Sequence, residues 1–159
     1  MSNSRHDIVL KRPAIRREIR LFIASPSDCS QERKIIRDIA DEMNEVFCQS
    51  LQVVLIPIGW ENVAPSLGEP QSVIDEAIDQ YDILVGVMWL RFGTPTSDGA
   101  QSGTEHEFNQ AYEIWKEAGK PIVMFYFNDQ PPQDMKSLDI EQYGQVRKFR
   151  EKIEKVALV

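Results

Sequence analysis

The segment Ser102-Gly103-Thr104-Glu105-His106-Glu107 brings hydroxyl, acidic and imidazole side chains together directly before a run with helical apolar spacing. Thr104 and Glu107 have the spacing of a capping box, in which each side chain bonds a free backbone amide at a helix start. The same position would place the Glu107 carboxylate where it could bind ribose hydroxyls and stabilise positive charge that develops on a sugar. The pattern leaves both roles open for Glu107, and the two roles are compatible.

Arg91 is the only Lys or Arg in the stretch from Asp38 to Glu107, which is otherwise acidic. It directly follows an apolar run, so we expect it at the carboxyl end of a strand. Its planar guanidinium could bind a pyrophosphate there through paired hydrogen bonds. The alternative is a salt bridge to a neighbouring carboxylate.

Two further segments could contact a nucleotide. Ser25-Pro26-Ser27-Asp28 follows the first apolar run and could present hydroxyls and amides at a helix start, although simple capping by Ser27 or Asp28 is the alternative. Trp60 could stack on a flat base, but a tryptophan beside an apolar run is also typical of a core.

Other kinds of catalytic site are not indicated. The sequence has no metal-ligand pattern, no Walker-type phosphate loop and no GxGxxG motif. It also lacks the Gly-x-Ser-x-Gly elbow of serine hydrolases and a cysteine paired with a plausible base. This leaves chemistry led by a carboxylate, with no metal and no cofactor.

The elements that must position these residues alternate along the chain. Apolar runs predict strands over 19–24, 51–58, 82–90 and 122–127, and helical spacing predicts helices over 28–50, 70–78, 104–118 and 140–156. The strands are apolar enough to be covered on both faces, which predicts an α/β fold with a doubly wound parallel sheet of about four to five strands. Ligands bind such sheets beyond the carboxyl ends of the strands, so the loops at 25–28, 59–69 and 91–103 should meet there.

The overall composition fits one folded domain. The chain has 159 residues, 42% of them hydrophobic, and a net charge of -7, which argues against a general nucleic-acid binder. It has no apolar run of the ~20 residues that cross a membrane and no signal-peptide pattern, and its two cysteines suggest a reducing, cytoplasmic location. Residues 1–17 are rich in Arg and Lys without apolar spacing and predict a flexible basic leader before a domain at 18–159.

Three motifs in this order resemble the DUF4062 family of TIR-like domains, which is similar to TIR domains and nucleoside 2-deoxyribosyltransferases. They are residues 19–28 with Glu32-Arg33, residues 86–94 (GVMWLRFGT) and residues 102–108 (SGTEHEF). The resemblance implies a flavodoxin-like fold. It also implies that Glu107, which matches the glutamate in the GTxxE pattern of the nucleoside 2-deoxyribosyltransferases, is catalytic.

The resemblance places the other candidates around a nucleotide cleft. It implies that Ser25 and Asp28 line the cleft, that Arg91 and Phe92 lie on the facing loop, and that Thr104 belongs to the same site. Trp60 is the remaining candidate for substrate binding.

The expected function is therefore that of an NAD+ glycohydrolase effector domain, which cleaves the nicotinamide–ribose bond in antiphage or immune signalling after oligomerisation. NAD+ would be the substrate. The resemblance also implies self-association and a C-terminal sensor or NTPase module in the full-length protein, with no direct contact to nucleic acid or membrane. The alternatives are a non-catalytic self-association module, and a nucleoside or nucleotide N-glycosidase or deoxyribosyltransferase.

Overall fold

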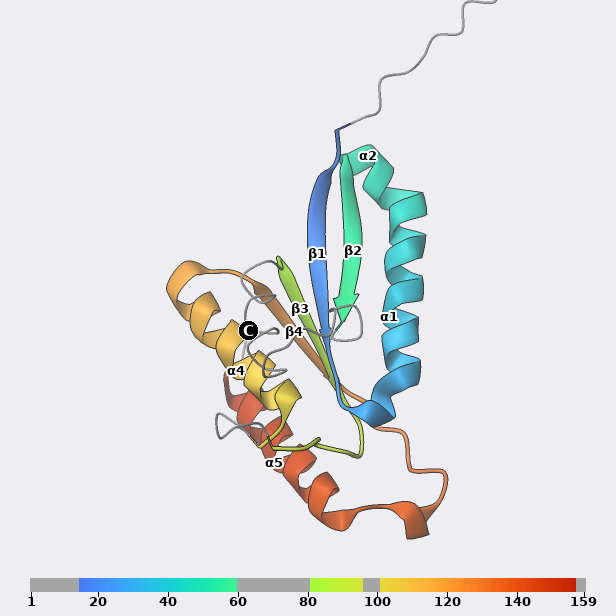
Figure 1. Cartoon of the computed structure of the whole chain (residues 1–159), viewed down its shortest axis with the longest axis vertical. Coiled ribbons are helices and arrows are strands. Elements are labelled where there is room, and N and C mark those ends of the chain that lie inside the picture. The colour runs from blue at the N-terminus through green and yellow to red at the C-terminus, as the bar shows by residue number, and fades with distance from the viewer. Residues whose placement is uncertain (1–14, 60–80, 96–100, 157–159) are drawn as a thin grey trace, which may run out of the picture.

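The computed structural model of the chain describes residues 15–59, 81–95 and 101–156. Within these residues, the centre is a sheet of four parallel strands in the order β2-β1-β3-β4 (Figure 1). The strands are β1 (Arg17–Ala24), β2 (Val53–Gly59), β3 (Ile83–Met88) and β4 (Ile122–Phe127). The doubly wound parallel sheet expected from the apolar runs is therefore confirmed, and it is consistent with a flavodoxin-like fold.

One continuous helical run connects β1 to β2, as the spacing over 28–50 predicts. It consists of α1 (Ser30–Met43), a π-helical turn (η2, Asn44–Cys48) and the short α2 (Gln49–Leu51). The Asn44 side chain fixes this run against β2, because its amide group bonds both the N–H and the C=O of Leu55, at 2.8 and 2.9 Å.

The helices lie on both faces of the sheet. α4 (Gly103–Ala118) and α5 (Ile140–Val156) lie on the opposite side of the sheet from α1 (Figure 1). Leu21 and Ile23 of β1 pack in the cluster that includes Ile36 of α1, whereas Phe22 and Ala24 pack with Ala111 of α4. This alternation along β1 follows from the two-residue period of a strand.

The outer strand β4 contradicts the expectation that every strand is covered on both faces. Its residues alternate between a packed face (Val123, Phe125, Phe127) and an exposed face (Ile122, Met124, Tyr126). The packed face lies against α4 and α5. The exposed face is on the α1 side, where α1 packs beside β2 at the other end of the sheet.

β3 and β4 come close together at Gly86. A Cβ atom at this position would lie only 2.1 Å from the Phe125 ring, which occupies the space above the glycine. Phe125 also packs edge-on against Phe108 of α4 and Phe149 of α5, so Gly86 admits the ring that joins the sheet to both helices.

Other predicted features either have different bounds in the structure or lie outside the described residues. Among the described residues, no helix is both long and apolar enough to cross a membrane. β1 begins at Arg17, two residues before the predicted strand. Residues 1–14, Trp60 and the predicted helix over 70–78 lie outside the described residues.

Candidate functional site

The carboxyl ends of β1 and β3 lie side by side at the point where the strand order reverses, the usual ligand position in open α/β sheets. Asp28, in the turn after β1 (η1, Ser27–Cys29), joins these two strand ends. Its Oδ2 accepts hydrogen bonds from the backbone N–H groups of Leu90 and Arg91, both at 3.0 Å. Asp28 therefore fixes the segment after β3 to the segment after β1, and it caps neither η1 nor α1.

Ser25 is buried at the end of β1, and its hydroxyl is bound by an arginine that was not among the predicted site residues. Arg33 of α1 donates from Nη1 to Ser25 Oγ at 2.8 Å and to the Pro26 carbonyl at 2.9 Å. Both acceptors are neutral, and the guanidinium makes no ion pair with the described residues. Arg33 belongs to the first of the three sequence motifs, as part of Glu32-Arg33. Its contact with the end of β1 depends on the fold, so the motif alone did not predict it.

The loop after β3 is held from α5. Gln142 Oε1 accepts from the backbone N–H groups of Phe92 and Gly93, both at 2.9 Å, and its Nε2 donates to the Gly93 carbonyl at 3.2 Å. The Phe92 ring is buried against Phe149, with ring centroids 5.6 Å apart, so this predicted substrate contact belongs to the core. Arg91 is exposed, and its guanidinium makes no ion pair with any described residue.

The start of α4 corrects the predicted capping box. The N-cap is Ser102, whose Oγ accepts from the Glu105 N–H at 3.0 Å, and Glu105 Oε2 accepts from the Gln101 N–H at 3.1 Å. The helix begins two residues earlier than a Thr104 cap requires, so Thr104 and Glu107 lie inside it. The capping role considered for Glu107 is therefore wrong, and its carboxyl group does not cap the start of the helix.

Glu107 is a buried acid, with 6% of its surface exposed. Burial raises its pKa from 4.5 to about 8, because the ionised form loses its hydration. At neutral pH the free carboxyl group is therefore mostly protonated. Thr104, one turn earlier on α4, is also buried.

Two buried polar groups lie near this acid. Burial and the nearby Glu107 carboxyl both raise the pKa of the Tyr81 phenol, and the Tyr81 ring stacks on Phe22 of β1. Of the described side chains, Tyr81 Oη and Gln110 Oε1 are buried without a hydrogen-bond partner. Gln110 follows Glu107 by three residues on α4, which places the two on neighbouring positions of the helix surface. Sequence reasoning missed both Tyr81 and Gln110.

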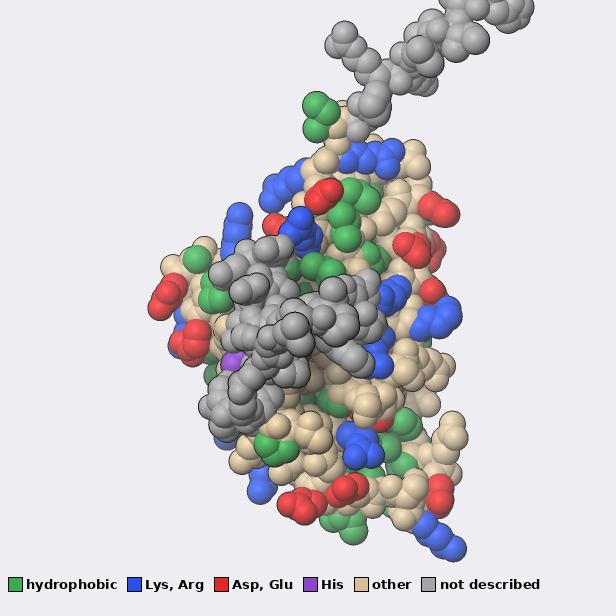
Figure 2. Space-filling view, in the orientation of Figure 1, with side chains coloured by type: hydrophobic (Ala, Val, Ile, Leu, Met, Phe, Trp, Pro, Cys, Tyr) green, Lys and Arg blue, Asp and Glu red, His purple; other side chains and the backbone are tan. Residues whose placement is uncertain are grey.

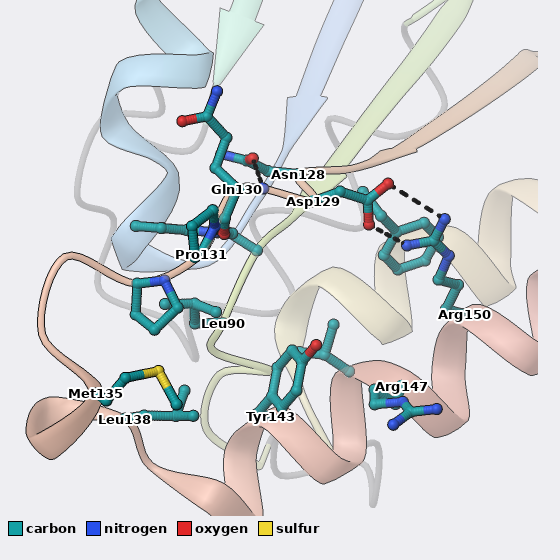
Figure 3. A pocket seen from close by; sticks show the side chains of 14 residues that line it. Leu90, Asn128, Asp129, Gln130, Pro131, Met135, Leu138, Tyr143, Arg147 and Arg150 are labelled. Atoms are coloured by element: carbon teal, nitrogen blue, oxygen red, sulfur yellow. Dashed lines mark hydrogen bonds and ion pairs between the residues drawn. The ribbon is translucent and has the colours of Figure 1, made fainter.

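A separate pocket of about 280 Å³ lies beyond the carboxyl ends of β3 and β4 (Figure 3). Apolar side chains such as Leu90, Pro131 and Leu138 form much of its lining, and Arg150 at its edge is paired with Asp129. None of the predicted site residues within the described part of the chain lines it. The structure thus gathers Ser25, Asp28 and Arg91 at the β1 and β3 ends and places Glu107 and Thr104 on the first turns of α4.

The comparison with protein families agrees with the motifs around these positions. The model of DUF4062, a domain of unknown function, matches residues 20–159 of the chain. The chain belongs to the DUF4062 family. No curated protein and no solved structure matches this DUF4062 chain. Its described residues contain no group of His, Cys, Asp and Glu side chains that could hold a metal ion.

Proposed function

We propose that this DUF4062 chain is a TIR-like NAD+ glycohydrolase domain that cleaves the bond between nicotinamide and ribose. The observation that carries the proposal is Glu107, a buried carboxyl group with a pKa raised to about 8 and no part in helix capping. The unpartnered Tyr81 and Gln110 atoms give further support, because buried polar groups normally find a partner in protein, water or ligand.

The proposed reaction uses the change of charge on the substrate. The nicotinamide ring of NAD+ is cationic, so its approach favours the ionised form of Glu107. As the bond to nicotinamide breaks, positive charge moves to the ribose, and the carboxylate stabilises it until water attacks. Burial strengthens this stabilisation, since little solvent screens the two charges.

Other residues would have distinct roles in this proposal. The Arg91 guanidinium is the candidate for the pyrophosphate, because it is exposed and makes no ion pair in the described part of the chain. Asp28 would keep Arg91 in position through its backbone N–H group. Ser25 would help to hold Arg33 at the strand end, where its guanidinium makes no ion pair with a described residue.

The test is the release of free nicotinamide from NAD+ by the purified protein. We expect Glu107→Gln to lower kcat by at least about 100-fold, because it removes the negative charge that stabilises the sugar cation. Glu105→Gln is the matched control: it makes the same chemical change two residues away, and the amide oxygen of glutamine can still accept from the Gln101 N–H. Full activity in Glu107→Gln would refute the assignment.

The second candidate is a non-catalytic module that self-associates to transmit a signal in the cytoplasm, joined to a C-terminal sensor or NTPase module. The exposed apolar residues of α1 and β4 favour it. It differs from the first candidate in having no NAD+ turnover even in the assembled protein. Assays with nucleosides and nucleotides, read by the release of free base, separate both from an N-glycosidase or deoxyribosyltransferase.

A further inference from the structure

Three polar side chains at the inner face of α4 are left without a bonding partner among the described residues. Tyr81 Oη and Gln110 Oε1 are both buried and take part in no hydrogen bond. The Glu107 carboxyl group makes no hydrogen bond or ion pair with a described residue. We call these three side chains the Glu107 cluster. Buried polar groups in native proteins are nearly always bonded, so the members of the cluster are candidates to bond one another.

The packing of α4 on the sheet brings the cluster together. The Tyr81 ring stacks on Phe22 of β1 with ring centroids 5.3 Å apart, and both rings pack in the core that includes Ala111 of α4. Ala111 follows Glu107 by one helical turn and Gln110 follows it by three residues, so these positions are neighbours on the helix surface. Burial and, after it, the charge of Glu107 raise the pKa of Tyr81. Tyr81 therefore approaches Glu107 from the sheet, and Gln110 from the helix.

Gln110 suits the protonated form of the acid. Its buried atom is Oε1, which accepts hydrogen bonds and cannot donate one. A protonated carboxyl group has an O–H donor, whereas a carboxylate has none. Burial raises the pKa of Glu107 to about 8, so this proton is present at neutral pH. A hydrogen bond from Glu107 to Gln110 would stabilise the neutral acid.

Tyr81 suits the ionised form. Its raised pKa means that the phenol keeps its proton and remains a donor. A hydrogen bond from a hydroxyl group to a carboxylate is about twice as strong as one between neutral groups. Donation from Tyr81 Oη would therefore stabilise the carboxylate more than the neutral acid.

The charged groups beside the cluster are Glu105 and His106 of α4, Lys152 of α5, and Asp82 and Arg17 at the starts of β3 and β1. Glu105 lies 3.7 Å from Lys152, and Asp82 lies 4.0 Å from Arg17. The core side chains of β1 and β3 that pack with Tyr81 carry no charge. Within the described residues, burial alone raises the pKa of Glu107, so these charges leave its titration to the cluster.

We propose that Tyr81 and Gln110 are positioning residues that control the charge of Glu107: Gln110 Oε1 accepts the proton of the neutral acid, and Tyr81 Oη donates to the ionised acid. This proposal rests on the proposed function, in which Glu107 ionises as the cationic nicotinamide ring approaches. Tyr81 then holds the carboxylate in place while positive charge develops on the ribose.

An NMR titration of the Glu107 side-chain carboxyl carbon tests the cluster without substrate. The full chain carries ¹³C in its glutamate carboxyl groups, and the signal missing in Glu107→Gln identifies the residue. We expect Tyr81→Phe to raise the midpoint of the titration by at least about one pH unit, and Gln110→Met to lower it by at least about half a unit. A general loosening of the core would lower the midpoint in both variants, because water would then reach the acid.

Two matched variants control for the loss of a phenol or an amide elsewhere. Tyr112→Phe changes a phenol of α4 whose ring stacks on Phe108, and Gln145→Met changes a half-buried amide of α5. Both should keep the wild-type midpoint. An unchanged midpoint in Tyr81→Phe or Gln110→Met, or a change in the same direction in both, overturns the proposal.

The pH profile of nicotinamide release separates this proposal from the proposed function. The profile of kcat/KM reports the ionisations of the free enzyme, so its midpoint should move with the NMR midpoint in each variant. If both NMR midpoints move as expected and no nicotinamide is released, the two hydrogen bonds stand and NAD+ cleavage is refuted. If nicotinamide release depends on Glu107 and neither midpoint moves, the roles of Tyr81 and Gln110 are refuted.

Discussion

Glu107 shows how the setting of a side chain changes what it can do. Its motif made it a candidate catalytic residue, but the same motif suggested a capping role that Ser102 and Glu105 fill in the structure. Spacing alone could not show which glutamate belongs to the helix cap, because Ser102 precedes Glu105 and Thr104 precedes Glu107 by the same three residues. The burial that sets its pKa comes from packing of α4 on the sheet, which a local pattern does not contain.

Residues that act over long sequence distances were not predictable in the same way. The Gln142 side chain bonds the loop at Phe92, 50 residues earlier, and no local pattern links the two. Tyr81 precedes β3, whose apolar run predicted a strand. Its phenol lies near Glu107 only after α4 has packed on the sheet, so the sequence does not show this neighbour.

The raised pKa of Glu107 predicts how stability changes with pH. Its pKa is near 4.5 in the unfolded chain and near 8 in the folded chain. Between these values the folded chain keeps a proton that the unfolded chain has lost. The free energy of unfolding should therefore fall as the pH rises from about 4.5 to 8, by on the order of 5 kcal/mol, and then level off.

Urea unfolding at a series of pH values measures this slope. Glu107→Gln should remove most of the decrease in this pH range, because glutamine does not titrate. Glu105→Gln should keep the decrease. Identical pH profiles for the wild type and Glu107→Gln would show that the buried carboxyl group is not responsible.

At the scale of elements, strands and helices were predictable because their hydrophobic periods are local. The helix over 140–156 and the strand over 122–127 have the predicted bounds. The uncovered face of β4 was not predictable, since the segment Ile122-Val123-Met124-Phe125-Tyr126-Phe127 is apolar at every position. Such a run does not reveal which face a helix covers.

Neighbouring residues of β4 provide a test of this difference between faces. Phe125→Ala removes a ring packed among Phe108, Phe127 and Phe149 and should lower the free energy of unfolding by about 3 kcal/mol. Tyr126→Ala, on the exposed face, should lower it by less than about 1 kcal/mol.

Denaturant unfolding at low protein concentration keeps any dimer from contributing to this comparison. If both variants lowered the free energy of unfolding by the same amount, both faces of β4 would have to be covered in the single chain.

At the scale of the whole molecule, the two faces of the sheet are unequal. α4 and α5 pack over one face with the larger aromatic cluster, while α1 leaves the β4 side of the other face open. The surface seen in Figure 2 mixes Lys and Arg with Asp and Glu over its visible part, so the net charge of -7 does not appear there as one acidic region. Apolar exposure, more than charge, distinguishes the surface beside α1.

The hydrogen bonds of Gln142 also bear on the order in which the chain folds. The loop at Phe92 and Gly93 receives these bonds from a residue 49 to 50 positions later in the chain. Until α5 has formed and docked, these backbone groups lack the partner that holds them in the native chain. The segment that carries Arg91 should therefore reach its final shape late in folding, after the sheet to which it is attached.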